Sequence, residues 1–383
     1  MSPGNAHCGC RGGGFSLVEL MIALTLGLLI MAAIFGMYVD MSRTNQEMAK
    51  TSSQIENARF ALQFLQSDIV HGGYWGGFVP AFDDLSLGSV PTDAPASLPN
   101  PCLAYSSPWN TAYIDSLIGI PIQSFDTAPP GCTSVVANVQ PDTDVLVVRH
   151  AGTCVPGAAG CEADVGGKLY FQASFCELES AAHYLLGTSA LNLHGRACVA
   201  GTPIGGPLAP KRRFVSNIYY IRNFSVSPGD GIPTLVRSEF DLAGSTLAHQ
   251  PAVALIEGIQ GFRVELGIDN LGDTGAATDY TAAIAWADPG NRDSPGNRGD
   301  GSPDGAFVRC TTASPCTVAQ LSDVVAVQIF VLVRANTLTP GYTDTRTYTL
   351  GNTTLGPFND GFKRHVFSRS VRLVNVSGRR ETP

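Results

Sequence analysis

Glu19 is the residue whose surroundings most restrict the chemistry it can do. It is the only charged residue in an apolar run that extends from Phe15 to Val39. A charge at the centre of a bilayer costs roughly 2.5–3.5 kcal/mol on insertion scales, so an acid in such a run is expected to have a function. If the chain were cut between Gly14 and Phe15, Glu19 would lie about 7 Å along a helix from the new amino terminus. The helix dipole favours a carboxylate in that first turn.

One long predicted helix must position Glu19. Residues 15–39 are long enough, at about 1.5 Å per residue, to cross a hydrocarbon core of about 30 Å. Arg11 precedes them, which favours a cytoplasmic leader and an external remainder. Residues 40–71 continue the helix as an amphipathic segment whose apolar positions recur at helical spacing: Ile55, Ala58, Leu62, Leu65 and Ile69. Gly72 and Gly73 predict the end of the helix.

A helix from Phe15 to about Val70 is longer than a globular domain needs. Its second half can lie on a domain, but its first half has nothing in the same chain to bury it. That half therefore requires lipid or other copies of itself, which predicts a subunit of a filament.

The stretch Gly14-Phe15-Ser16-Leu17-Val18-Glu19-Leu20 resembles the class III signal of type IV prepilins. The resemblance implies that a prepilin peptidase cuts after Gly14 and that Phe15 is then N-methylated. It also implies that Glu19 docks against the N-terminal ammonium of Phe15 on a neighbouring subunit. The leader differs from many prepilins because Arg11 stands behind three glycines. A secretory signal cut near Ala32-Ala33 and a plain membrane anchor are the alternatives, but the apolar run is too long for the first. Neither alternative explains Glu19 behind a glycine.

Further stretches are similar to PilW-type minor pilins: residues 57–69 followed by Gly72-Gly73-Tyr74, and residues 215–222, 233–237, 255–262 and 324–334. The similarity implies a non-enzymatic minor pilin that acts in assembly initiation and at the pilus tip. Its partners would be other minor pilins, the major pilin, the prepilin peptidase, the inner-membrane assembly platform and a tip adhesin. The protein would sit in the bacterial inner membrane, with its N-terminus cytoplasmic and its ectodomain periplasmic, before it enters the filament at the cell surface.

Two other functions remain open at this point. A minor pseudopilin of a type II secretion system uses the same N-terminus. A membrane-tethered adhesin or enzyme that borrows a prepilin signal is the other.

Composition supports an α+β fold with a β-rich globular part. The chain has 383 residues and a net charge of −8, which argues against a nucleic-acid-binding surface. Its 42 glycines and 25 prolines indicate many turns. We expect four parts: a leader at 1–14, a membrane or filament-core helix at 15–39, an amphipathic helix at 40–71 and a pilin-like ectodomain at 72–383. Predicted strands cover residues 145–148, 214–221, 252–259, 262–268, 324–333 and 364–376, and a short helix is predicted within Glu177–Leu193.

The cysteines divide between the leader and the ectodomain. Cys8 and Cys10 lie in the leader, and the other eight follow the membrane segment: Cys102, Cys132, Cys154, Cys161, Cys176, Cys198, Cys310 and Cys316. A translocated domain meets an oxidising compartment, so these eight are disulfide candidates. Eight cysteines allow 105 connectivities, of which nearest-neighbour pairing is the expected one. The absence of a Cys-x-x-Cys pair disfavours zinc binding or redox catalysis.

The loop from Asp288 to Gly305 is the most polar stretch of the chain. Its carboxylates Asp288, Asp293 and Asp300 are weak calcium candidates, because calcium takes several oxygen ligands from a flexible loop. EF-hand spacing is absent, and Arg292 and Arg298 offset the charge, so an exposed turn is the favoured interpretation. The sequence has no His-Glu-x-x-His, phosphate-binding glycine loop or nucleophile elbow. We therefore expect no enzymatic activity and no cofactor.

Overall fold

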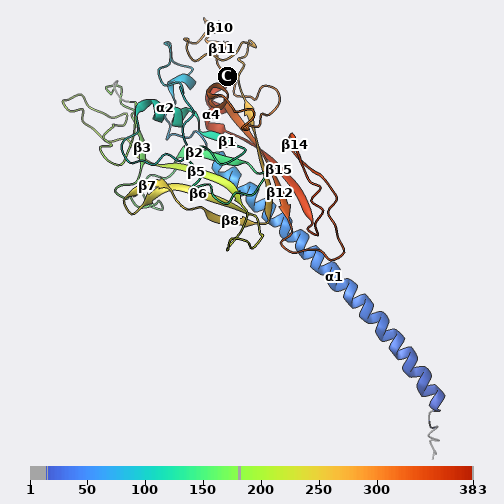
Figure 1. Cartoon of the computed structure of the whole chain (residues 1–383). Coiled ribbons are helices and arrows are strands. Elements are labelled where there is room, and N and C mark those ends of the chain that lie inside the picture. The colour runs from blue at the N-terminus through green and yellow to red at the C-terminus, as the bar shows by residue number, and fades with distance from the viewer. Residues whose placement is uncertain (1–13, 15, 180–182, 382–383) are drawn as a thin grey trace, which may run out of the picture. The chain divides into compact units, whose positions relative to one another are not determined.

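The computed structural model describes residues 14, 16–179 and 183–381. The chain divides into two compact units, residues 1–52 and 53–383. Helix α1 (Leu17–Ile69) begins in the first unit and ends in the second (Figure 1). The predicted N-terminal helix is thus present, and it ends three residues before Gly72.

The part of α1 that belongs to the second unit buries one face. The buried residues are Gln54, Ala58, Ala61, Leu62, Leu65 and Ile69. Ile55 was expected on this face but is 50% exposed. Gln54 takes the inward position instead, and its Nε2 donates to the carbonyl oxygen of Lys363 at 2.6 Å. A polar residue therefore occupies the inward position at the N-terminal end of the stripe, where the spacing predicts an apolar one.

The main sheet of the second unit is antiparallel and has eight strands. These are β1 (Ile122–Phe125), β2 (Val145–Ala151), β3 (Tyr170–Ala173), β4 (Tyr184–Gly187), β5 (Arg212–Arg222), β6 (Thr234–Ala243), β7 (Thr246–His249) and β8 (Val253–Glu257). The path runs β1-β2-β5-β3-β4, and β6 pairs with β5, β7 and β8. Among the described strands β1 pairs only with β2, so it forms an edge of the sheet.

A second sheet has three antiparallel strands in the order β15-β12-β9. They are β9 (Ile259–Ile268), β12 (Val324–Arg334) and β15 (Arg364–Arg372). Strand β12 is central and almost wholly buried, as its continuous apolar sequence predicts. Two ribbons complete the strands: β10 (Trp286–Asp288) with β11 (Asp293–Pro295), and β13 (Tyr348–Leu350) with β14 (Thr353–Leu355). The short helices are η1 (Ala81–Asp83), α2 (Thr111–Gly119), α3 (Val318–Ser322) and α4 (Val374–Arg380).

Two local expectations are wrong. The described part of residues 177–193 contains strand β4 and turns rather than a helix. The closing strand ends at Arg372, and the last residues of the expected strand begin helix α4. Helix α4 buries Val376 and Arg380, so interior contacts outweigh the strand-like alternation of its sequence.

The largest hydrophobic core joins the end of α1 to both sheets. Ala58, Leu62 and Leu65 of the helix pack in one cluster with Tyr219 of the main sheet and Val331 of the second sheet. A separate aromatic cluster surrounds Trp75. A third hydrophobic cluster packs on strands β2, β5 and β6. The eight cysteines of the second unit form four disulfides in nearest-neighbour order: Cys102–Cys132, Cys154–Cys161, Cys176–Cys198 and Cys310–Cys316.

Candidate functional site

The start of α1 is a capping box built from Ser16 and Glu19. The Ser16 hydroxyl oxygen accepts from the backbone N–H of Glu19 at 3.2 Å. In return the Glu19 carboxylate, through Oε2, accepts from the Ser16 backbone N–H at 2.9 Å and from its hydroxyl at 3.0 Å. This reciprocal pair satisfies donors that the first turn of a helix leaves unpaired. Because both bonds to Glu19 use Oε2, no described residue bonds its Oε1.

The predicted cleavage site lies directly before this box. Gly14 is exposed, and a Cβ placed on it would meet nothing within 4 Å. Phe15, with its predicted N-methylation, and leader residues 1–13 lie outside the described residues. The cleavage and methylation assignments therefore stay predictions from the sequence.

The first unit exposes its apolar surface. Every large apolar side chain from Leu17 to Tyr38 is 54–74% exposed. Among the described helices, α1 is the one long and apolar enough to cross a membrane. The Thr25 hydroxyl in this stretch donates to the carbonyl of Ile22 at 2.9 Å and so needs no external partner. The surface therefore offers hydrophobic contact on all sides, with Glu19 at one end.

A buried polar cluster attaches the end of α1 to the main sheet. The Asp68 carboxylate bonds the His150 ring at 3.0 Å, the Asn217 amide at 3.0 Å and the Tyr219 hydroxyl at 2.9 Å. Burial alone would raise the pKa of Asp68, but these three partners outweigh it and hold the pKa below its ordinary value. The carboxylate thus stays charged at the half-buried contact between the helix and strands β2 and β5, which it links.

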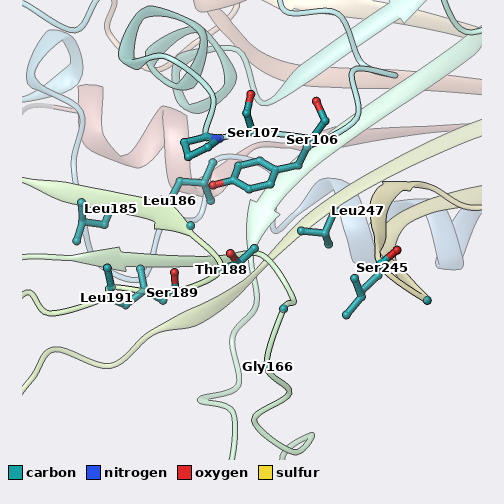
Figure 2. Close-up of a pocket in the computed structure, with 17 residues that line it drawn as sticks. Ser106, Ser107, Gly166, Leu185, Leu186, Thr188, Ser189, Leu191, Ser245 and Leu247 are labelled. Atoms are coloured by element: carbon teal, nitrogen blue, oxygen red, sulfur yellow. The ribbon is translucent and has the colours of Figure 1, made fainter.

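Figure 2 shows a groove of about 710 Å³ beside strand β4. It is bordered by the loop around Tyr105, residues 185–191 and the β6–β7 turn. The hydroxyls of Ser106, Ser189 and Ser245 lie along it (Figure 2). Its described lining holds neither a carboxylate nor an imidazole, so these residues offer no general acid or base of ordinary strength.

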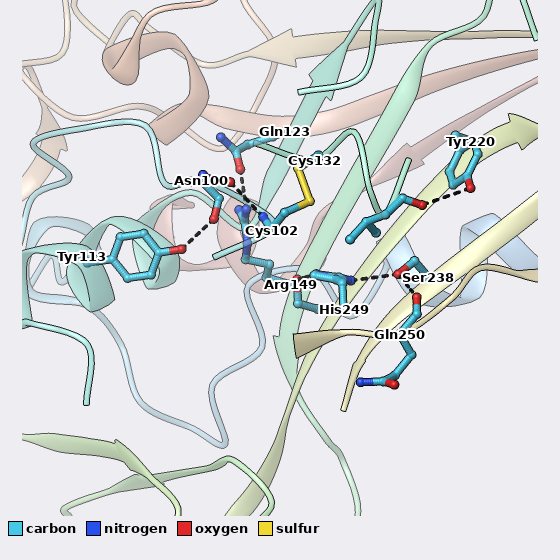
Figure 3. The surroundings of a disulfide bond; sticks show 12 residues. Asn100, Cys102, Tyr113, Gln123, Cys132, Arg149, Tyr220, Ser238, His249 and Gln250 are labelled. Atoms are coloured by element: carbon cyan, nitrogen blue, oxygen red, sulfur yellow. Dashed lines mark hydrogen bonds between the residues drawn. A yellow bond between two sulfur atoms is a disulfide. The ribbon is translucent and has the colours of Figure 1, made fainter. Parts of the chain in front are cut away.

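A belt of buried polar residues crosses one face of the main sheet near the Cys102–Cys132 disulfide (Figure 3). Arg149 is fully buried and donates to the Ile120 carbonyl at 3.0 Å and to Gln123 Oε1, with no carboxylate paired to it in the described chain. Burial lowers its pKa to about 10. The ring of His249 lies between the hydroxyls of Ser216 and Ser238, at 3.3 and 3.2 Å. The belt separates two apolar clusters on this face.

The acidic loop uses its carboxylates in local turns. Asp288 accepts from the backbone N–H groups of Gly290 and Asn291 at 3.0 and 3.3 Å. Asp293 is its cross-strand neighbour in the β10–β11 ribbon, and Asp300 accepts from the backbone of Ser302 at 2.8 Å. Within the described ranges no three His, Cys, Asp or Glu side chains gather in a way that could hold a metal ion.

Sequence reasoning identified Glu19 but missed its partner and the buried polar groups. The Ser-x-x-Glu spacing before an apolar run is itself a helix-start signal that identifies Ser16. Asp68 carries a weaker signal, as a lone acid beside the buried stripe of α1. Arg149 has no local signal, because its burial follows from strand pairing far along the chain.

The chain combines a long apolar N-terminal helix with a β-rich domain that holds four disulfides, an architecture typical of type IV pilin-like proteins. Residues 218–375 match the model of the family described as Type IV Pilus-assembly protein W, and residues 11–35 match the prokaryotic N-terminal methylation motif. The chain therefore contains a region similar to the PilW family and an N-terminal stretch that matches the methylation motif.

One solved structure shares part of the chain's length. It is a type IV-like pilin from Thermus thermophilus, 14% identical, and the match covers 61% of this chain and 79% of that one at a TM-score of 0.25. No curated protein matches the chain at a significant level. The assignment above rests on the family models and on the architecture rather than on this likeness.

Proposed function

We propose that this protein is a minor pilin, a non-enzymatic subunit of a type IV pilus that acts in assembly initiation and at the pilus tip. The proposal rests on the exposed apolar surface of the first unit. Its apolar side chains are exposed from Leu17 to Tyr38, and the capped carboxylate of Glu19 lies in the first turn of this run. In water such a surface is unfavourable, because apolar area gains free energy when removed from solvent. Lipid before assembly and neighbouring subunits afterwards would cover it.

Glu19 is the proposed docking residue. Its Oε2 is held by Ser16, so the carboxylate has a fixed orientation when a neighbouring subunit arrives. The N-terminal ammonium of the neighbour's processed chain would then bond Oε1. An unpaired charge in the apolar core of a filament is strongly penalised, so this pairing would select the axial register.

The membrane arrangement follows from the same helix. Before assembly, α1 would cross the inner membrane with its N-terminus in the cytoplasm and the ectodomain in the periplasm. The prepilin peptidase and the assembly platform would act on it there. Other minor pilins, the major pilin and a tip adhesin would be its later neighbours.

Mass spectrometry of the mature N-terminus tests the processing. A chain that begins with methylated Phe15 is expected, and a chain that retains Met1 would refute the proposal. A Glu19→Ala variant should be processed normally yet enter filaments at less than a tenth of the wild-type amount. The matched control is Glu47→Ala, an acid of the same unit outside the apolar run. Equal incorporation of Glu19→Ala and wild type would refute the docking role.

Gene deletion distinguishes a pilus subunit from the two alternative functions. Loss of surface pili and twitching is the expected result. Loss of exoprotein secretion with normal pili would instead indicate a pseudopilin of a type II secretion system. Normal pili together with a lost binding or enzymatic activity would indicate a tethered adhesin or enzyme.

A further inference from the structure

A second groove, of about 530 Å³, runs along the free edge of strand β1. One wall is the continuous segment 123–130, which contains most of β1 and the chain after it. The other walls are residues 98–101 and the loop closed by the Cys310–Cys316 disulfide. Prolines and Phe125 make up much of the lining. The groove therefore follows the direction of a strand edge.

Two polar side chains at the floor of this groove have no partner. Gln123 is 1% exposed and Ser124 is 3% exposed. Among the described residues, neither Gln123 Nε2 nor Ser124 Oγ has a hydrogen-bond partner. Arg149 donates to Gln123 Oε1 (Figure 3), which fixes the amide and leaves its N–H donors unpaired. Buried polar groups without partners are rare in folded proteins, so these two call for an explanation.

The backbone of Ser124 points into the same space. The Pro121 carbonyl accepts from the Arg149 N–H, which makes these two residues a hydrogen-bonded position of the β1–β2 pair. In an antiparallel pair the bonded positions alternate, so Gln123 and Phe125 face β2 and Ser124 faces away from it. The N–H and C=O of Ser124 thus lie on the side of β1 that pairs with no described strand, at a residue that is 3% exposed. No described residue bonds either of them.

The walls of the groove are rigid. The Cys102–Cys132 disulfide joins the chain after residues 98–101 to the chain after residues 127–130, both of which line the groove. At the end of β1 the Asp126 carboxylate accepts from the Thr312 backbone N–H at 3.0 Å and from its hydroxyl at 2.7 Å. These links connect the three walls. A ligand that fits would therefore bind with little ordering of the protein.

We propose that this groove binds an extended segment of another polypeptide, which adds as a strand to the edge of β1. Its main chain would pair with the N–H and C=O of Ser124, and an acceptor on it would take the Gln123 N–H. Its apolar side chains would pack on Phe125 and the prolines. An extended peptide supplies a donor and an acceptor at strand spacing, which is how exposed sheet edges recognise partners. The groove in Figure 2 has no such unpaired buried side chain in its described lining.

Peptide binding to the full-length protein in detergent micelles tests the proposal. The probes are three fluorescent pentapeptides, acetyl-Thr-X-Val-X-Thr-amide, in which X is valine, leucine or phenylalanine. At least one is expected to bind saturably and to slow hydrogen exchange of the Ser124 amide. The same peptide with its alternate amides N-methylated should bind at least tenfold more weakly. Because the purified protein is used, this result is independent of whether the chain enters a filament.

Two pairs of variants keep the test specific. Ser124→Pro removes the outward N–H at an edge position where proline is tolerated, and should weaken binding at least tenfold. Ser124→Ala removes only the hydroxyl and should change binding by less than fivefold. Thr133→Trp, at the exposed rim, should block the groove without touching the sheet. Ser189→Trp places the same side chain on the other groove and should bind as wild type.

Three results would overturn the proposal. The first is the absence of saturable binding by all three probes. The second is equal binding of the N-methylated peptides, which would indicate an apolar site for side chains or small molecules. The third is unchanged binding by Ser124→Pro together with Thr133→Trp.

Discussion

The two units of this chain satisfy their polar and apolar groups in opposite ways. In residues 17–52 the polar groups bond within one helical turn, as when Thr44 donates to the Asp40 carbonyl at 2.9 Å. The apolar side chains there are exposed. In residues 53–383 many apolar side chains are buried in hydrophobic clusters, and charged groups pair across long distances in sequence. Arg380, for example, is 1% exposed and meets Asp83, Asp269 and Asp323 at 3.0, 3.2 and 3.0 Å.

This difference shows that the second unit has an interior formed by its own residues, whereas the first unit does not. Breaking a buried ion pair leaves an uncompensated charge, so the ectodomain depends on contacts that it makes itself. No side chain of residues 17–52 is buried, so a substitution there leaves no cavity inside the fold. Substitutions can therefore be sorted by unit. All three tryptophans, Trp75, Trp109 and Trp286, lie in the second unit, so their fluorescence reports on that unit alone.

The largest expected effect comes from Asp68→Ala. It leaves His150, Asn217 and Tyr219 without their shared partner in the core. We expect the free energy of unfolding to fall by about 3–5 kcal/mol, because each polar group left without a hydrogen-bond partner costs about 1–3 kcal/mol. Urea unfolding followed by tryptophan fluorescence measures it.

The control for Asp68→Ala is Asp40→Ala, an exposed acid of the first unit. It should leave the fluorescence transition unchanged. An equal shift in the two variants would contradict the division of the chain into a unit that completes its interior and one that does not.

The disulfides give the second prediction, because their loops differ in length. Cys102 and Cys132 are 30 residues apart, whereas Cys310 and Cys316 are 6 apart. Loop-closure entropy predicts a stabilisation of about 3.5 kcal/mol for the first and about 2 kcal/mol for the second. Double Cys→Ser variants of each pair, compared by urea unfolding, should preserve that order. The reverse order would mean that local packing around the short loop outweighs chain entropy.

The part of the molecule that could be predicted from sequence is the part governed by local rules. Helix α1 follows from helical periodicity and strand β12 from its continuous apolar sequence, and the disulfides pair in nearest-neighbour order along the chain. The inward turn of Gln54 could not be predicted, because it depends on a carbonyl 309 residues away. Helix α4 could not be predicted from the sequence either, because it also depends on contacts distant along the chain. Its Arg380 is drawn inward by acids from three separate segments.

The candidate sites also differ in whether neighbouring or distant residues of the sequence form them. Gly14, Phe15 and Glu19 stand together in the sequence, so the motif is visible without a fold. The β1 groove is assembled from residues near 100, 125 and 310, and its unpaired groups depend on which way each residue of an edge strand faces. One residue of slip in that strand would turn Ser124 toward β2.

Substitutions at two glycines, one in each unit, test the same difference between the units with a smaller expected effect. A Cβ added at Gly36 in the first unit would meet nothing within 4 Å, whereas one at Gly261 would lie 2.8 Å from Leu332 Cβ. Gly261→Ala should therefore lower the free energy of unfolding by about 1–3 kcal/mol through overpacking. Gly36→Ala should not move the fluorescence transition. If Gly261→Ala were as stable as wild type, the second sheet would have to be looser than its contacts indicate.

The smallest expected effect is on the pH dependence of stability, and it concerns His249. Burial, and then the charge of Arg149, lower the pKa of this imidazole to about 3 from an ordinary value of 6.5. Between these two values the unfolded chain takes up a proton that the folded chain does not. Stability therefore falls as the pH drops below 6.5, by about 1.4 kcal/mol per pH unit for this one group.

His249→Gln removes that proton uptake. The wild type should therefore lose about 2 kcal/mol more than the variant between pH 7 and pH 5, in urea unfolding at each pH. His365→Gln, at an exposed position of β15, is the control and should follow the wild type. Parallel curves for His249→Gln and wild type would show that the imidazole is charged inside the fold. Because residues 17–52 contain no histidine, any difference between these curves arises in the unit that completes its own interior.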